Sequence, residues 1–98
     1  MKLSGRHKKH LKSLGHQLRP VVRVGQKGIT DAVREELDGA LAHHELVKIK
    51  VGIGDRHLRS SAVRQLADAT RADLIQSIGQ VAILYSRNVK SPVIHFPK

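Results

Sequence analysis

Residues Gly25-Gln26-Lys27-Gly28 form the pattern in this chain that most resembles a binding loop, because two glycines enclose a cation. A phosphate can come close to a backbone only where no Cβ intrudes, and glycine removes that atom while allowing unusual backbone angles. Lys27 adds a mobile positive charge. The helix expected to follow presents free N–H groups and the positive end of its dipole. The pattern predicts contact with a phosphate backbone, although a GxxG sequence by itself is also typical of an ordinary tight turn.

Further cations are expected close to this loop. Arg56 and Arg59 fall in the first turn of a predicted helix, where positive charge opposes the helix dipole. A local rule broken beside a second glycine-bearing loop indicates function, and the alternative is a pair of solvated side chains. Arg23 is expected with Lys48 and Lys50 on the open face of the predicted sheet, where strand cations can also be plain solvent-facing charge.

Positive charge is concentrated at the start of the chain. The sequence holds 18 Lys and Arg against 8 Asp and Glu, a formal net charge of +10, and residues 1–28 contain eight of these cations and no acid. Leucines recur there at helical spacing, which predicts a helix with one buried face and one basic face. Such a face attracts polyanions, and a solubilising surface is the alternative. The leucines are Leu3, Leu11, Leu14 and Leu18, and the basic face holds Lys2, Arg6, Lys8, Lys9, Lys12 and His16.

Composition disfavours several classes of function. No apolar run reaches the roughly 18 residues that cross a membrane, residues 1–9 lack a signal-peptide pattern, and there is no Cys for disulfide or thiolate chemistry. Tyr85 and Phe96 are too few for a base-stacking aromatic sheet. No Walker A motif occurs, and His57 interrupts a partial dinucleotide-binding pattern. The histidines lack the spacing of a metal site, and no catalytic constellation is recognisable. We expect no enzymatic activity, cofactor, metal, membrane contact or small-molecule substrate, and a cytoplasmic location.

Hydropathy and turn residues predict the element order α-β-α-β-α-β-β. Helices are expected over residues 5–16, from Thr30 onward and over 56–71. Strands are expected over residues 21–24, 46–53, 73–78 and 80–86, and Gly79-Gln80 joins the last two strands in a hairpin. The third helix should face inward with Leu58, Ala62, Leu66 and Ala69.

These elements predict an α/β fold, a two-layer sandwich with a four-stranded mixed sheet. Strands separated by a helix should be parallel with right-handed crossovers, so the helices pack on one face, with an extra helix at the N-terminus. Residues 1–98 are expected to form a single domain in which residues 87–98 are an extended tail. The topology places the Gly25–Gly28 and Gly52–Asp55 loops at the same end of the sheet.

Four segments carry a resemblance to a known family: LKSL at 11–14, LRPVVRVGQKGIT at 18–30, HHELVKIKV at 43–51 and IGQVAILY at 78–85. In order and spacing they resemble a stand-alone bacterial CRM domain of the YhbY type over about residues 3–96. The resemblance implies a fold similar to the C-terminal domain of bacterial translation initiation factor three. It also implies RNA binding through the GxxG loop, which is compared to that of KH domains. Bacterial single-domain members are associated with precursors of the large ribosomal subunit, and plant relatives with organellar intron splicing.

We therefore expect a non-catalytic protein that binds ribosomal RNA in precursors of the large ribosomal subunit and assists their assembly. One alternative is a ribosome-associated adaptor that binds an assembly or ribosomal protein through its basic face, with RNA contact incidental. Another is general compaction of double-stranded DNA. The residues expected to bind RNA are Gly25, Gln26, Lys27, Gly28, Lys8, Lys9, Lys12, Arg23, Arg56 and Arg59.

Overall fold

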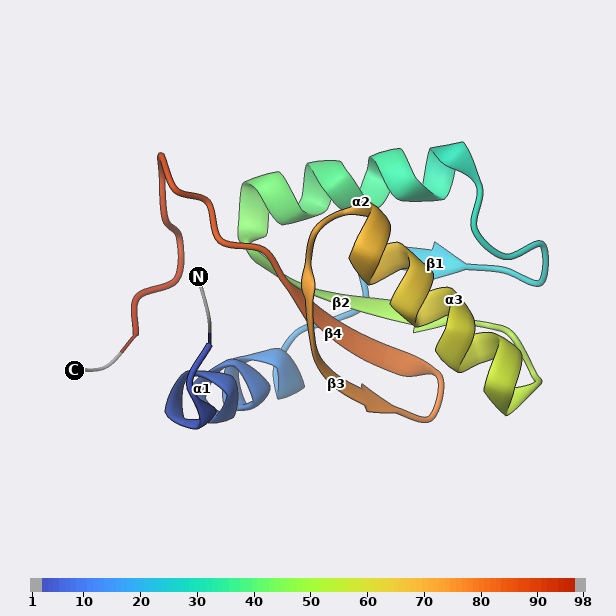
Figure 1. Cartoon of the computed structure of the whole chain (residues 1–98), viewed down its shortest axis with the longest axis horizontal. Helices are drawn as coiled ribbons and strands as arrows, with labels where there is room; N and C mark the ends of the chain where they lie inside the picture. The colour runs from blue at the N-terminus through green and yellow to red at the C-terminus, as the bar shows by residue number, and fades with distance from the viewer. Residues whose placement is uncertain (1–2, 97–98) are drawn as a thin grey trace.

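Helices and strands follow one another in the predicted order in a computed structural model of the chain, of which residues 3–96 are described (Figure 1). The predicted fold class is confirmed. Pro97, Lys98 and the first two residues, including the expected basic-face Lys2, lie outside the described residues. The elements are α1 (Gly5–His16), β1 (Val22–Val24), α2 (Asp31–His44), β2 (Leu46–Val51), α3 (Arg56–Ala69), β3 (Asp73–Ile78) and β4 (Val81–Tyr85).

The four strands form one mixed sheet in the order β1-β2-β4-β3. β1 runs parallel to β2, as the crossover through α2 predicts, with Val24 opposite Val51. β4 is antiparallel to both of its neighbours, β2 and β3. Gly79, with a φ of +57°, turns the β3–β4 hairpin in a conformation that suits glycine. The last strand in the sequence is therefore central in the sheet.

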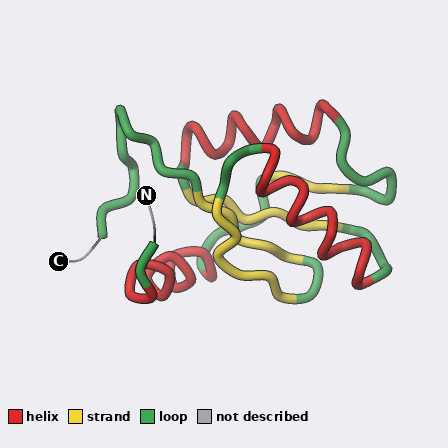
Figure 2. The backbone as a smooth tube through the Cα atoms, in the orientation of Figure 1, coloured by secondary structure: helices red, strands yellow, loops and turns green. Residues whose placement is uncertain are grey.

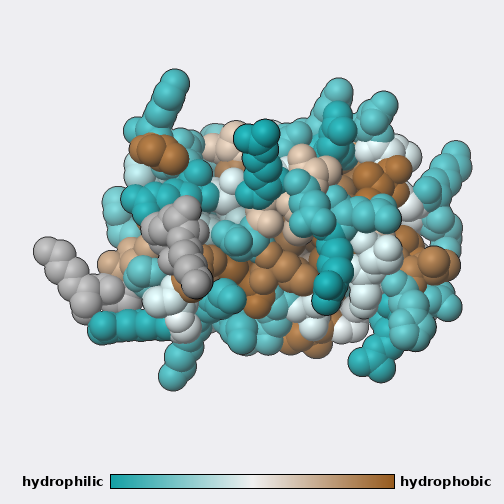
Figure 3. All heavy atoms as spheres, viewed as in Figure 1, coloured by the Kyte–Doolittle hydropathy of each residue, from teal (hydrophilic) through white to brown (hydrophobic). Residues whose placement is uncertain are grey.

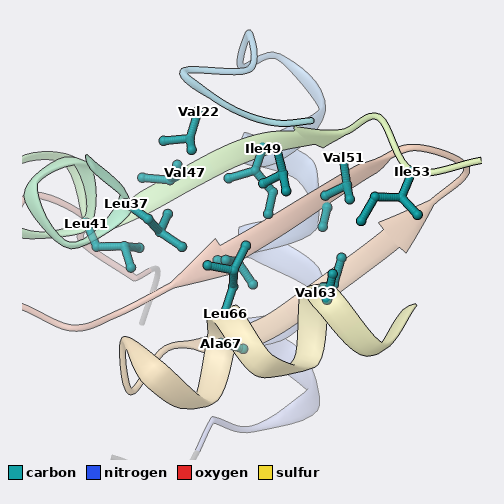
Figure 4. Packing of buried hydrophobic residues seen from close by; sticks show 14 residues of the cluster. Val22, Leu37, Leu41, Val47, Ile49, Val51, Ile53, Val63, Leu66 and Ala67 are labelled. Atoms are coloured by element: carbon teal, nitrogen blue, oxygen red, sulfur yellow. The ribbon is translucent and has the colours of Figure 1, made fainter. Parts of the chain in front are cut away.

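The crossover helices α2 and α3 pack on one face of the sheet and build the larger hydrophobic core (Figure 4). Leu37 and Leu41 of α2 and Leu66 of α3 meet the side chains of β2 that point to this face. The prediction for α3 is wrong at two positions: Leu58 is 63% exposed and Ala69 is also exposed. The buried face of α3 consists instead of Ala62, Val63, Leu66 and Ala67.

The first helix, α1, covers part of the opposite face. Leu11 is completely buried among Leu46, Ile75 and Ile83, because β2 and β4 carry apolar side chains on both of their faces. The two-layer description therefore applies to α2, α3 and the sheet, and α1 adds a third layer (Figure 1). Gly15 lies inside α1, where an added Cβ would be 2.6 Å from Ile83 Cδ1. The lack of a side chain lets the helix approach the sheet closely.

A buried carboxylate, that of Glu45, attaches the C-terminal segment to the sheet. Glu45 links α2 to β2 with a φ of +63° and has no exposed surface. Its carboxylate accepts hydrogen bonds from the backbone N–H groups of Asn88 at 2.6 Å, Val93 at 2.5 Å and Ile94 at 2.6 Å. Residues 87–96 contain no helix or strand (Figure 2). Three of their backbone N–H groups, those of Asn88, Val93 and Ile94, donate to this side chain instead of to a sheet.

The end of the described tail packs on α1. The ring of Phe96 lies 4.4 Å from that of His7 and 6.0 Å from that of Tyr85, measured between centroids. Phe96 and Ile94 join the smaller core beneath α1, which also holds Leu11. The tail thus closes one edge of the cluster that seats the first helix.

Because of Glu45, stability should depend on pH in the acid range. Burial acts to raise the pKa of the Glu45 carboxyl, but the three backbone donors and the nearby Arg87 outweigh burial and hold that pKa below its ordinary value of 4.5. A group with a lowered folded-state pKa stabilises the fold fully above its ordinary pKa and loses this contribution as the pH falls through the folded value. The Glu45→Gln protein should lose about 1–3 kcal/mol of unfolding free energy at neutral pH.

Denaturant unfolding across the acid range tests this prediction. The parent protein should lose stability more steeply below pH 4.5 than Glu45→Gln does, since the variant has no such carboxylate to protonate. Glu36→Gln, at an exposed position on α2, is the matched control and should follow the parent. Parallel pH profiles for the parent and Glu45→Gln would contradict a structural role for this carboxylate.

Candidate nucleic-acid interface

The Gly25–Gly28 loop is a tight turn between β1 and α2. The Gly28 N–H donates to the Gly25 carbonyl at 2.9 Å, which leaves Gln26 and Lys27 at the exposed tip. Gly28 has a φ of +78°, so the turn itself requires a glycine there. Gly25 has an ordinary backbone conformation, and nothing lies within 4 Å of a Cβ built on it. Gly28 is therefore needed for the backbone conformation of the turn, whereas Gly25 leaves open space beside its backbone.

Groups of the chain itself already satisfy part of the N-terminus of α2, where an anion could otherwise bind. The Thr30 side chain accepts a hydrogen bond from the Val33 N–H at 3.1 Å and so caps the helix. Asp31 places a carboxylate in the first turn, where it already meets the positive end of the dipole. A polyanion is accordingly favoured at the tip of the loop, around Lys27, and not at the helix end behind it.

A second glycine loop, residues 52–55, lies beside the first, as the parallel pairing predicts. The Gly52 N–H donates to the Val24 carbonyl at 2.7 Å and so joins the two loops at their bases. An added Cβ at Gly54 would meet nothing within 4 Å. Figure 1 shows the 25–28 turn and the start of α3 at the same end of the molecule. Two open glycine backbones therefore share one edge of the sheet.

The two arginines at the start of α3 differ in their surroundings. Arg56 is exposed beside the loop. Arg59 is half-buried, and its Nη1 donates to the Ile53 carbonyl at 2.9 Å and to the Gly54 carbonyl at 3.3 Å. A cation at this end of a helix thus has a local partner, which offsets its unfavourable position in the helix dipole. Arg59 therefore stabilises the second loop through these two hydrogen bonds, whereas the side chain of Arg56 is exposed to solvent.

The cations of the sheet lie on the face that α1 covers in part. Arg23 is opposite Lys50 in the parallel register, and both side chains are exposed. Lys48 reaches the end of α1, where its Nζ donates to the His16 carbonyl at 3.4 Å. This lysine supplies positive charge to the negative end of the helix dipole. Arg23 and Lys50 therefore remain available beside the first loop.

The basic face of α1 lies apart from the glycine loops. Lys8, Lys9 and Lys12 are all exposed, as the amphipathic pattern predicts. Figures 1 and 2 show α1 toward the end of the molecule opposite the 25–28 turn, along an axis of 41 Å. The predicted binding residues thus form two groups, one at the loops and one on α1. A single ligand must extend along the sheet to contact both.

Hydrophilic side chains dominate the outline of the face in Figure 3, and hydrophobic residues gather in its middle.

In the described part of the chain, no group of three His, Cys, Asp or Glu side chains is placed to hold a metal ion. Among the described helices, none has both the length and the apolarity needed to span a membrane.

Sequence reasoning did not identify Glu45 or the docking of the tail. A single Glu between a helix and a strand carries no motif, and its partners lie 43 to 49 residues further along the chain. The proline-containing segment predicted an extended tail but gave no sign of what receives it.

Comparison with known proteins gives a consistent result. The profile of the CRS1/YhbY (CRM) domain matches residues 3–86. The chain is 42% identical over 90 residues to Probable RNA-binding protein PA4753 of Pseudomonas aeruginosa, covering 92% of this chain and 86% of that protein. It is 41% identical over 83 residues to an RNA-binding protein of Haemophilus influenzae, covering 85% and 84% respectively.

A solved structure supports the same assignment. The solution structure of SAV1595 from Staphylococcus aureus, described there as a candidate RNA-binding protein, superimposes with a TM-score of 0.84 at 29% identity. The match covers 98% of this chain and all of that one. Sequence profile, relatives and topology agree, and the chain belongs to the CRS1/YhbY (CRM) domain family.

Proposed function

We propose that this protein binds RNA through the Gly25–Gly28 turn, and that the RNA is ribosomal RNA in precursors of the large ribosomal subunit. The observation that carries the proposal is the exposed turn itself, where an open glycine backbone stands next to Lys27. Relatives named as RNA-binding proteins support it. The net charge of +10 supplies the long-range attraction that a phosphate backbone requires.

The geometry suggests how the RNA is held. Phosphates approach the open backbone at Gly25 and Gly54, while Lys27, Arg23 and Arg56 provide charge around the two loops. Contacts of this kind read the shape of the RNA backbone and not its base sequence. Binding is therefore expected to favour structured RNA of a suitable shape.

The ribosomal part of the proposal rests on the resemblance to stand-alone bacterial members of the family. Crosslinking in cells followed by sequencing of the bound fragments tests it directly, and large-subunit ribosomal RNA should dominate the fragments. Nuclease treatment of a lysate should release the protein from ribosomal particles. Retention on particles after nuclease treatment would favour an adaptor that holds an assembly or ribosomal protein.

A methyl group at Gly25 tests close approach of RNA to the turn. Gly25→Ala should fold normally, because the added Cβ meets open space and the backbone is unstrained. It should weaken RNA binding several-fold without changing the salt dependence, because charge is unchanged. Gly28→Ala is not a clean probe, since its φ of +78° strains any side chain by on the order of 1 kcal/mol. A Gly25→Ala protein with parental melting and parental RNA affinity would refute close approach.

Salt dependence measures the number of phosphates that the protein neutralises. For about four to six phosphates, log K should fall against log salt with a slope of roughly −3 to −5. Lys27→Ala should reduce that slope by about one contact and weaken binding to all RNAs alike. Arg64→Ala, at an exposed position on α3 away from the loops, serves as the matched control. An affinity that does not change with salt would contradict the mechanism.

Replacing Lys8, Lys9 and Lys12 with Gln tests whether α1 belongs to the same interface. These side chains are exposed, so the melting temperature should change little. RNA affinity should fall and the salt slope should become shallower. The control carries the same loss of charge at exposed positions away from both α1 and the glycine loops, namely Arg64, Arg71 and Lys90. Equal RNA affinity in the α1 variant and the parent would limit the interface to the loops.

A further inference from the structure

An aliphatic groove of about 540 Å³ lies between the end of α1, the start of β2 and the C-terminal tail. Its apolar walls come from Leu14, Leu18, Val21, Leu46, Val47 and Ile94. Val21 is 50% exposed and Leu18 is 36% exposed, although the chain buries most of its large aliphatic side chains. None of the RNA-binding residues proposed above lines this groove.

The groove exists because β1 is shorter than its partner. β1 pairs only with the last three residues of β2, and one further bond runs from the Val21 N–H to the Lys48 carbonyl at 3.0 Å. Pro20 comes directly before Val21 and, like Leu18 and Arg19, lies outside the strand. Leu46 and Val47 thus line the groove where the paired edge ends. An extended segment placed here would continue the edge of the sheet.

Charge restricts what can occupy the groove. Arg19 and Lys48 are among its lining residues, and among the described residues that line it there is no Asp or Glu. A second copy of this chain, with its own net charge of +10, is disfavoured by repulsion. A nucleobase is disfavoured because most of the described lining is aliphatic and His44 supplies the single ring among those residues.

We propose that this groove binds an extended segment of a partner protein in which aliphatic side chains alternate with carboxylates. The aliphatic side chains would fill the space between Leu18, Val21 and Ile94. The carboxylates would pair with Arg19 and with Lys48, whose ammonium has two N–H donors besides the one directed at the His16 carbonyl. The wall at Ile94 is held in place by the bond from its N–H to Glu45. The protein would then hold RNA at its loops and a protein segment at the groove.

The test uses the full chain labelled with ¹⁵N and a short fluorescein-labelled peptide in which Leu and Glu alternate. The peptide should shift the amide resonances of Leu46, Val47 and Lys48. Leu18→Ser and Arg19→Glu should each weaken binding by about tenfold, measured by fluorescence anisotropy. Val89→Ser and Arg64→Glu are matched controls at exposed positions outside the groove, and they should bind as the parent does.

Comparison probes make the outcome decisive. A peptide with Ser in place of Leu should bind much more weakly, and so should one with Lys in place of Glu. Equal binding of the Ser peptide would reduce the effect to bulk charge and overturn the proposal. Shifts of the groove amides by an RNA hairpin in place of the peptide, or no binding of the Leu–Glu peptide to the parent, would also overturn it. Arg19 is exposed, so Arg19→Glu remains informative if Leu18→Ser is unstable.

Discussion

The three-residue strand β1 holds the candidate interface together, because its parallel register with β2 ends at Val24 and Val51. The loops that follow both strands therefore begin at the same end of the sheet. The hydrogen bond from the Gly52 N–H to the Val24 carbonyl holds the two loops together there. Without this pairing, Gly25 and Gly54 would have no reason to share a surface. The geometry of the candidate interface depends on backbone pairing more than on any single basic side chain.

Element order, parallel and antiparallel pairing, and the position of the glycine loops were predictable from the sequence. These features depend on local signals, such as the alternation along Leu46–Val51 and the capping residues Thr30 and Asp55, whose side chains cap α2 and α3. The resemblance to the family and the hydrophobic periodicity predicted the same fold, so each supported the other. The predicted exposure of Lys8, Lys9 and Lys12 also followed from periodicity alone.

Features that depend on distant contacts were not predictable in this way. The place of α1 depends on both faces of β4 being apolar and on the absence of a side chain at Gly15, and neither contact has a local signal in the sequence. Arg59 breaks a helix-dipole preference, which suggested ligand binding, yet the carbonyls of Ile53 and Gly54 supply a local reason. A broken local rule can thus be satisfied within the fold before any ligand is considered.

Both ends of the described chain meet in one place. Leu3 and Phe96 pack against the same small core beneath α1, while the glycine loops lie at the far end of the long axis (Figure 1). A domain fused to either end would therefore emerge beside the other terminus and leave the loops open. This arrangement suits a module that can be joined in tandem or appended to larger proteins, since neither connection has to cross the glycine loops.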